Sequence, residues 1–221
     1  MNLVLASQAT THNARLAISQ LLNTQTSSIP TVGYIASAPD PQREYFNATQ
    51  QLYTALNAQM CVYLELESEF SSQTLTALFA CDVIHLSGGD TERFLTAIKQ
   101  RQLIEPLTTF AHHGGAIVGV SAGAMLLTPS IVSATLCGDN ITGDNAQLEA
   151  LNLVPFQFVP HFKSQQLSNR QFNQQLKTLQ TNVYLCGDND AIAIEQHKVL
   201  LYGSPQLHQH IEQSHTYIKD C

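Results

Sequence analysis

Short apolar runs rich in β-branched residues alternate with longer stretches in which apolar residues recur every three or four positions. The short runs predict buried strands, and the longer stretches predict amphipathic helices. Strand followed by helix, repeated along the first half of the chain, is typical of an α/β fold with a mostly parallel, doubly wound sheet and helices on both faces. The predicted strands are Leu3–Ala6, Val32–Ser37, Cys61–Leu66, Val83–Leu86 and Ala116–Val120.

Capping residues mark the ends of two of the helices predicted between these strands. Pro41–Ala58 follows Asp40, which we expect to be its N-cap, and it carries proline in its first turn. Glu105–His113 is followed by Gly114 and Gly115, and glycine readily adopts the left-handed conformation that ends a helix. The other predicted helices are Asn13–Leu22, Ser72–Phe79 and Thr91–Lys99.

The alternation becomes less regular after Pro129. A loop or short helix is expected over Cys137–Asn152, which is rich in Gly, Asp and Asn, and a hairpin is expected around Gln196–Lys198. The polar, His-rich tail Leu207–Cys221 is a candidate edge strand with no assigned role. The remaining predicted elements are the strands Phe156–Pro160, Val183–Cys186, Ala191–Glu195 and Val199–Tyr202 and a Gln-rich helix near Leu167–Leu179.

Length and composition limit the classes of function. With ~150 residues per domain as a guide, a chain of 221 residues without an internal linker predicts a single domain over residues 1–221. Seventeen acidic against ten basic residues, with no basic cluster, argue against a nucleic-acid partner. No run approaches the ~20 apolar residues of a membrane span. The five cysteines lack C-x-x-C spacing, so we expect reduced thiols and a cytoplasmic protein without a zinc site.

The segment Ala116–Leu127 carries Gly119-x-Ser121-x-Gly123 between an apolar strand and a helix-compatible run. A serine on a tight strand-to-helix turn needs small neighbours so that its hydroxyl projects above the sheet. The helix N-terminus that follows also favours developing negative charge. The pattern therefore predicts a nucleophilic Ser121, the alternative being a tight turn that only packs against a neighbouring strand.

A second loop, with the sequence Ser-Gly-Gly-Asp at 87–90, joins the strand Val83–Leu86 to the helix that begins at Thr91. Paired glycines between a strand and a helix leave backbone amides free to point at an anion. The alternative is a loop whose glycines only satisfy backbone geometry. At the carboxyl edge of the sheet this loop would face Ser121 and supply the second half of an oxyanion hole.

Together these segments resemble the peptidase E and cyanophycinase family of serine peptidases, whose marks are a G-G-N-T-x-x-L loop and a G-x-S-A-G-A elbow. The resemblance continues in a strand-borne P-H-F, in an arginine at the start of the next helix, and in an acid before an apolar strand. Two departures are Asp90 for the usual Asn, and Asp188 where the best-known members have Glu. The matching residues are Gly88-Gly89-Asp90-Thr91 through Leu95, Gly119 through Ala124, Pro160-His161-Phe162, Arg170 and Gly187 through Ala191.

A serine nucleophile needs a base, and the base needs an orienting acid. Among the nine histidines, His161 is the candidate base because it follows an apolar strand that can deliver it to the active edge. Asp188 is the first choice for the acid, because it stands on a loop before a strand and matches the acid of the family. The reserve candidates for the acid are Asp190, Asp139 and Asp144. The other histidines considered are less suited to be the base: two close a helix (His112 and His113), and four lie in turns or the tail (His197, His208, His210 and His215).

We expect a serine peptidase in which Ser121 attacks, His161 transfers the proton and Asp188 orients the imidazole, with the amides of Gly89 and Ala122 as the oxyanion hole. The resemblance implies a flavodoxin-like or class I glutamine amidotransferase-like three-layer sandwich. It also implies a dipeptide substrate with N-terminal Asp or, less favoured, the aspartyl backbone of cyanophycin. No metal or organic cofactor is expected. The residues assigned to substrate binding are Gly88, Asp90, Thr91 and Arg170.

Two other classes stay open. A non-enzymatic small-molecule binder on the same fold is supported by the departures at Asp90 and Asp188, which fall in or beside the expected site. An esterase of the α/β-hydrolase fold has the order Ser, acid, His, which would require Asp139 or Asp144 as the acid. The sequence also leaves a homodimer open.

Overall fold

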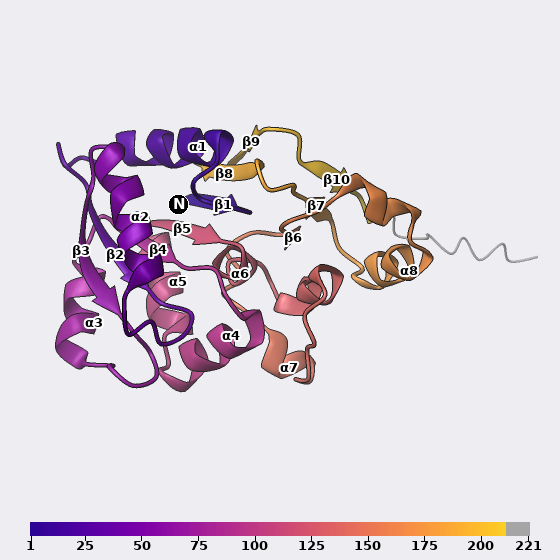
Figure 1. Cartoon of the computed structure of the whole chain (residues 1–221), viewed down its shortest axis with the longest axis horizontal. Coiled ribbons are helices and arrows are strands. Elements are labelled where there is room, and N and C mark those ends of the chain that lie inside the picture. The colour runs from indigo at the N-terminus through magenta and orange to yellow at the C-terminus, as the bar shows by residue number, and fades with distance from the viewer. Residues whose placement is uncertain (211–221) are drawn as a thin grey trace, which may run out of the picture.

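The computed structural model describes residues 1–210, which form a seven-stranded sheet, a three-stranded sheet and the helices around them (Figure 1). The seven-stranded sheet has the order β3-β2-β4-β5-β1-β8-β9. Its first five members in this order are parallel, whereas β8 and β9 run antiparallel at one edge. These strands are β1 (Asn2–Ala6), β2 (Thr31–Ile35), β3 (Gln59–Leu64), β4 (Val83–Leu86), β5 (Ala116–Val120), β8 (Ala191–Glu195) and β9 (Lys198–Tyr202).

Helices cover both faces of this sheet, because successive strand residues point to opposite faces and both sets are apolar. In β1, Val4 and Ala6 pack with the helices of one face, whereas Leu3 and Leu5 pack with those of the other. The first face carries α1 (His12–Asn23) and α2 (Glu44–Ala55). The second face carries α3 (Ser72–Phe79), α4 (Thr91–Gln100), α5 (Ile104–His112) and α6 (Ala122–Met125). The predicted doubly wound α/β fold is thus confirmed.

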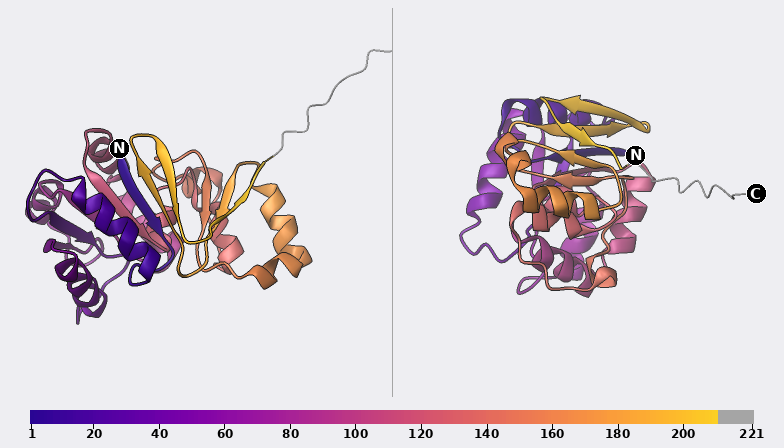
Figure 2. Two further views of the ribbon diagram at one scale, coloured as in Figure 1. Left: turned by 90° about the horizontal axis from the view of Figure 1, so that it is seen from above. Right: turned by 90° about the vertical axis from the view of Figure 1, so that its right-hand side faces the viewer.

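The three-stranded sheet lies at one end of the molecule together with α8, as the left view of Figure 2 shows. It joins β6 (Gln157–Val159) in parallel to β7 (Val183–Leu185), which pairs antiparallel with β10 (Gln206–His208). A separate apolar cluster fixes α8 (Arg170–Thr178) on this sheet through Phe172 and Leu176. The other elements are the 3-10 helices η1 (Ile131–Cys137) and η2 (Ser164–Ser168) and the short helix α7 (Asn145–Leu148).

The predicted start of the second helix at Pro41 is wrong. Arg43 adopts a left-handed conformation with φ 54°, which breaks the helical path, so α2 begins at Glu44. Asp40 nevertheless satisfies the first turn, since its carboxylate accepts the N–H groups of Glu44 and Tyr45, each at 3.1 Å. The expected capping interaction is therefore present, but it reaches across a turn.

The Gln-rich helix predicted near Leu167–Leu179 is two elements, η2 and α8. Asn169 separates them, and its side chain accepts the N–H groups of Gln171 and Phe172 at 2.8 and 3.2 Å. The predicted edge strand in the tail is β10, while His215 and Cys221 lie outside the described residues. Within residues 1–210, no helix is both long and apolar enough to cross a lipid bilayer.

Candidate active site

Ser121 lies on the turn between β5 and α6, with φ 51° and ψ −111°. Its N–H donates to the carbonyl oxygen of Ala6 at 2.8 Å, which ties the turn to the end of β1. The flanking glycines are required by close approach: a Cβ on Gly119 would lie 2.5 Å from the carbonyl oxygen of Gly123, and one on Gly123 would lie 2.2 Å from that of Leu86. The tight G-x-S-x-G turn thus exposes the serine hydroxyl above the sheet.

Three side chains form one chain of hydrogen bonds. Ser121 Oγ lies 3.0 Å from His161 Nε2, and His161 Nδ1 lies 2.6 Å from Asp188 Oδ1. Both partners of the second contact are open to solvent, with side-chain exposed fractions of 46% for His161 and 59% for Asp188. This is the arrangement in which an imidazole can take a proton from a hydroxyl while a carboxylate orients the ring.

The small sheet delivers the imidazole and the carboxylate. His161 follows β6 and Asp188 follows β7, and the carboxyl ends of these parallel neighbours lie at one edge. Two backbone bonds of 2.9 Å hold the outgoing chains together, from the N–H of Phe162 to the carbonyl oxygen of Cys186 and from the N–H of Cys186 to that of Val159. His161 itself has φ 58°, so the chain turns sharply at the residue that meets Ser121.

The three reserve acids have other partners. Asp190 accepts the N–H groups of Gly187 and Ser204, both at 2.8 Å, and so fixes the loop that carries Asp188. Asp139 accepts the hydroxyl of Thr91 at 2.8 Å. Asp144 is the N-cap of α7 and accepts the N–H of Gln147 at 2.9 Å. The carboxylate that meets the imidazole is that of Asp188, and the acids needed for the esterase alternative are engaged elsewhere.

Two backbone amides, those of Gly89 and Ala122, lie in segments that adjoin Ser121. Gly88 packs on this residue, since a Cβ built on it would lie 3.4 Å from the Cβ of Ser121. Within residues 1–210, the N–H groups of Gly89 and Ala122 have no hydrogen-bond acceptor. Gly89 has φ 149°, and a Cβ there would lie 2.2 Å from Ser37 Oγ, so only glycine fits. Free amides beside a nucleophile can stabilise negative charge on a carbonyl oxygen.

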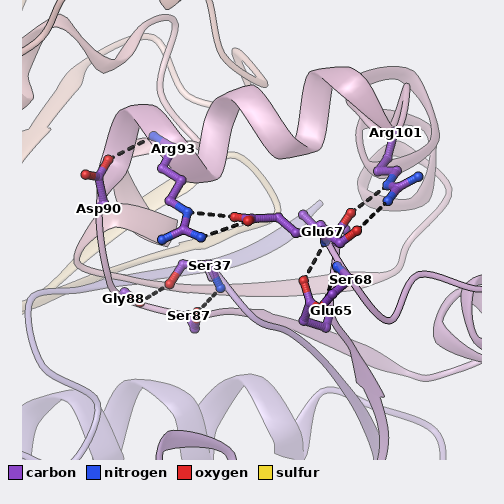
Figure 3. A network of polar contacts seen from close by, with 10 residues as sticks. Ser37, Glu65, Glu67, Ser68, Ser87, Gly88, Asp90, Arg93 and Arg101 are labelled. Carbon is purple, nitrogen blue, oxygen red and sulfur yellow. Dashed lines mark hydrogen bonds and ion pairs between the residues drawn. The ribbon is translucent and has the colours of Figure 1, made fainter. Parts of the chain in front are cut away.

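A polar network holds this glycine loop in place (Figure 3). Ser37 Oγ donates to the carbonyl oxygen of Gly88 at 2.6 Å, and the N–H of Ser37 donates to Ser87 Oγ at 2.8 Å. Asp90 is the N-cap of α4 and accepts the N–H of Arg93 at 2.8 Å. The guanidinium of Arg93 binds both carboxylate oxygens of Glu67, at 2.6 and 2.7 Å, and these contacts hold the pKa of that carboxyl below its usual range. The Arg93–Glu67 pair thus ties the start of α4 to the loop after β3.

The residues assigned to substrate binding differ in their surroundings. The carboxylate of Asp90 serves as a helix cap, and Thr91 is buried with its hydroxyl given to Asp139. Arg170 is the first residue of α8 and is exposed, and its guanidinium has no ion-pair or hydrogen-bond partner within residues 1–210. The side chain with free bonding capacity among these is therefore Arg170.

The thiols nearest the site are poor nucleophiles. Burial raises the pKa of Cys137 to about 12, and its Sγ lies 3.6 Å from the carbonyl oxygen of Pro160. Burial also raises the pKa of Cys186 well above its usual range. Both therefore stay protonated at neutral pH, which leaves the hydroxyl of Ser121 as the candidate nucleophile. Within the described residues, no cluster of three His, Cys, Asp or Glu side chains could hold a metal ion.

Comparison with known protein families decides the assignment. Residues 3–202 match the family model described as peptidase family S51. The chain belongs to peptidase family S51.

Curated relatives of this S51 chain cover only part of it. Peptidase E of Escherichia coli K12 is 33% identical over 88 residues, which is 40% of this chain and 37% of that relative. Peptidase E of Shigella boydii serotype 18 matches with the same identity and shares. The matched segment thus spans well under half the length of these relatives.

Two solved structures share the S51 fold. A peptidase E-like protein of Listeria monocytogenes EGD-e superposes with a TM-score of 0.68 at 22% identity, covering 92% of this chain and 98% of that one. A peptidase from an acI-B1 actinobacterium superposes with a TM-score of 0.63 at 16% identity, covering 95% and 90%. At these identities the likeness concerns the fold.

Some residues that shape this S51 site were not singled out from sequence. Ser37 Oγ donates to the carbonyl oxygen of Gly88 at 2.6 Å, and Ser7 Oγ donates to that of Cys186 at 3.1 Å. Each stands at or just beyond the end of a strand. A polar residue at the carboxyl end of a strand in a doubly wound sheet is the signal that could have identified Ser7 and Ser37.

Proposed function

We propose that this protein is a serine peptidase that hydrolyses small peptides, with dipeptides carrying N-terminal Asp as preferred substrates. One observation carries the proposal: Ser121 is hydrogen-bonded through His161 to Asp188, and the amides of the neighbouring residues Ala122 and Gly89 lack acceptors within residues 1–210. Membership of peptidase family S51 supports the same class of reaction.

In the proposed mechanism the hydroxyl of Ser121 attacks the carbonyl carbon of the scissile peptide bond. His161 Nε2 accepts the hydroxyl proton as the Oγ–C bond forms, and then delivers it to the leaving amine as the C–N bond breaks. Asp188 holds Nδ1–H and so keeps Nε2 free to act as the base. Water then attacks the resulting ester with the same imidazole as base, which releases the acid product and restores the serine.

The developing oxyanion is proposed to bind the N–H groups of Gly89 and Ala122. The amide of Ala122 is at the first turn of α6, and that of Gly89 lies on the loop braced by Ser37. Donors fixed before the reaction need no reorganisation when charge develops, and removing one such donor costs ~3 kcal/mol of transition-state stabilisation in comparable hydrolases.

For specificity we propose that Arg170 pairs with the side-chain carboxylate of an N-terminal Asp, while Gly88, Asp90 and Thr91 belong to the loop that contacts the substrate on the other side of the scissile bond. A planar guanidinium suits two-point binding of a carboxylate. The chain has only ten Lys and Arg in total, and Arg93 is already bound to Glu67. Few cations remain for this task.

The proposal needs no metal or organic cofactor, because serine, histidine, aspartate and backbone amides supply every proton and charge that the reaction requires. It places the enzyme in the cytoplasm, where an odd number of cysteines without paired spacing suits the reducing environment. The proposed partner is a small peptide.

The direct test combines labelling with turnover. A fluorophosphonate should attach to Ser121 in the parent protein and not in Ser121→Ala, as shown by peptide mass spectrometry. The parent should also release the N-terminal residue from Asp-Xaa dipeptides, and Ser121→Ala should not. An unlabelled, inactive parent would contradict the peptidase and favour the non-enzymatic binder.

The specificity claim has its own test. Arg170→Met should lower kcat/KM for Asp-Xaa dipeptides by about 10- to 100-fold, since a charge-assisted pair is lost, and should barely change neutral dipeptides. Lys177→Met, on the same helix and also exposed, is the matched control and should behave as the parent. Equal losses on both substrate types would assign Arg170 a structural role.

A further inference from the structure

A cavity of about 410 Å³ opens beside the glycine loop. It lies over the carboxyl ends of the central strands and against one side of α2, and its wall includes Gly88, Gly89 and Val120. Val120 immediately precedes Ser121, and Gly88 packs on the same serine. A group bound in this cavity would therefore lie next to the candidate nucleophile.

The wall is mainly apolar and carries negative charge only. Tyr34, Ala36, Pro39 and Val120 supply apolar surface, and the charged residues of the lining are Asp40 and Asp90. No Lys or Arg contributes to this cavity in the described part of the chain. Such a wall disfavours carboxylates and accepts neutral or aromatic groups.

The imidazole of His85 is a buried polar group of the wall. It stacks on Tyr34 with ring centroids 5.3 Å apart, while its Nδ1 lies 3.0 Å from the hydroxyl of Tyr53. Burial lowers the pKa of His85 to about 3, so the ring is neutral at physiological pH.

The partner of His85 settles which ring nitrogen carries the proton. Tyr53 is fully buried, and within residues 1–210 its hydroxyl has only Nδ1 as a partner. If Nδ1 were the donor, the hydroxyl hydrogen of Tyr53 would have no acceptor in the interior, which is costly. The hydroxyl therefore donates to Nδ1, and the proton of the imidazole is on Nε2.

This Nε2–H group has no hydrogen-bond partner among the described residues, and the nitrogen is accessible to solvent. Since His85 is a lining residue of the cavity, its accessible nitrogen faces that space. The cavity thus presents a neutral hydrogen-bond donor in a wall that also carries aromatic rings and two carboxylates.

We propose that this cavity receives the side chain of the residue on the leaving-group side of the scissile bond and selects a neutral aromatic residue, best one with an acceptor oxygen such as tyrosine. The assignment rests on the proposed function. In Figure 1, α8 with Arg170 and α2 with the cavity lie on opposite sides of α6, the helix that follows Ser121. A dipeptide held by its N-terminal Asp at α8 would extend across the serine toward α2.

The test compares Asp-Tyr, Asp-Gly and Asp-Glu as substrates. The parent should cleave Asp-Tyr with kcat/KM about tenfold or more above that for Asp-Gly, with Asp-Glu lowest, because the cavity buries a ring and repels a carboxylate. Ala48→Phe, on the exposed side of α2 that lines the cavity, should bring the ratio of Asp-Tyr to Asp-Gly close to one. Ala55→Phe makes the same change on the same helix outside the cavity and should keep the ratio of the parent.

Binding is measured separately from turnover, so that failure of the peptidase proposal can be distinguished from failure of the cavity proposal. Tyrosinamide should shift the ring N–H signal of His85 in the Ser121→Ala protein, and adding Ala48→Phe should abolish this shift. If no dipeptide is cleaved but this shift is seen, the peptidase proposal fails and the cavity stands as a site for aromatic groups. If Asp-Tyr and Asp-Gly are cleaved equally, or tyrosinamide leaves His85 unchanged, the cavity proposal is overturned.

Discussion

Ser121 combines a partly exposed hydroxyl with a backbone conformation that suits glycine better than serine. Its φ of 51° with ψ of −111° lies outside the regions that residues with a Cβ adopt without strain. Such a residue costs of the order of 1–3 kcal/mol and persists only where its surroundings enforce it. Here the enforcing contacts are the close approach of Gly123 to Leu86 and the bond from the N–H of Ser121 to Ala6.

Because of this strain, we expect glycine and alanine at position 121 to differ in their effect on thermal stability. Ser121→Gly should abolish hydrolysis and raise Tm by about 2–5 °C, because glycine relaxes the turn even after its entropic cost is subtracted. Ser121→Ala should abolish hydrolysis with Tm close to that of the parent, because alanine keeps the Cβ. Calorimetry with a dipeptide assay measures both, and equal melting temperatures for the two variants would show that the turn is unstrained.

Removing the charge of each acid in the 186–190 loop should affect a different property, activity for Asp188 and stability for Asp190. Asp188→Asn should lower kcat by about 10⁴-fold, since an amide favours the wrong imidazole tautomer, and should leave Tm nearly unchanged because the side chain is 59% exposed. Asp190→Asn should mainly lower Tm, because Asp190 accepts the amides of Gly187 and Ser204. A larger kcat loss in Asp190→Asn than in Asp188→Asn would reassign the acid.

At the scale of elements, the glycine loop at 87–90 is held at both ends by contacts with neighbouring elements. Its carbonyl oxygen at Gly88 is held by Ser37 from the neighbouring strand end, and its exit is fixed by the Asp90 cap and the Arg93–Glu67 pair. These contacts hold the loop in the conformation in which the amide of Gly89 has no acceptor. A contact that orients a transition-state donor affects kcat more than substrate binding.

Ser37→Ala tests the contact between Ser37 and Gly88. The variant should lose about 1 kcal/mol in its free energy of unfolding and several-fold in kcat, with KM nearly unchanged, because the amide of Gly89 is loosened where it meets the oxyanion. Thr24→Ala removes a comparable hydroxyl-to-carbonyl bond of 2.7 Å at the end of α1 and should lose stability without a change in kcat. A rise in KM alone in Ser37→Ala would contradict a role in orienting the amide.

Elements with strong local signals were predictable from the sequence. Ser72–Phe79, Val83–Leu86, Ala116–Val120 and Ala191–Glu195 have the predicted bounds. Each follows or precedes a clear turn or capping residue, so local chemistry decides its ends. The start of α2 was missed because the left-handed backbone of Arg43 is imposed by its surroundings, and arginine has no intrinsic preference for that conformation.

At the scale of the whole molecule, the site lies where the two sheets meet. Ser121 and the glycine loop come from the seven-stranded sheet, whereas His161 and Asp188 come from the ends of β6 and β7 in the three-stranded sheet. The candidate residues could be chosen from motifs, but the separate small sheet could not be predicted. Its pairings join segments distant in sequence, including β7 with β10, and no local pattern specifies them.

The neutral, buried imidazole of His85 should make the whole fold sensitive to mild acid. Its pKa is about 3 in the folded protein against an ordinary value of 6.5, so below pH 6.5 the unfolded chain binds a proton that the folded protein excludes. The free energy of unfolding should therefore fall with decreasing pH, by about 2 kcal/mol between pH 7 and pH 5 from this group. The carboxyl groups whose pKa is lowered by hydrogen bonds, such as Glu65 and Asp82, stay ionised in the folded protein throughout this window.

Replacing the pair His85 and Tyr53 with phenylalanine isolates this effect. The double variant removes both hydrogen-bond partners together and so leaves no orphaned polar group in the interior. Urea denaturation at pH 7, 6 and 5 should show the parent losing stability across the series and the variant losing about 2 kcal/mol less. Tyr53→Phe alone is the control and should keep the pH dependence of the parent, since His85 remains buried. Parallel losses in the parent and the double variant would mean that His85 is protonated within the folded protein, and would also remove the neutral donor on which the aromatic cavity depends.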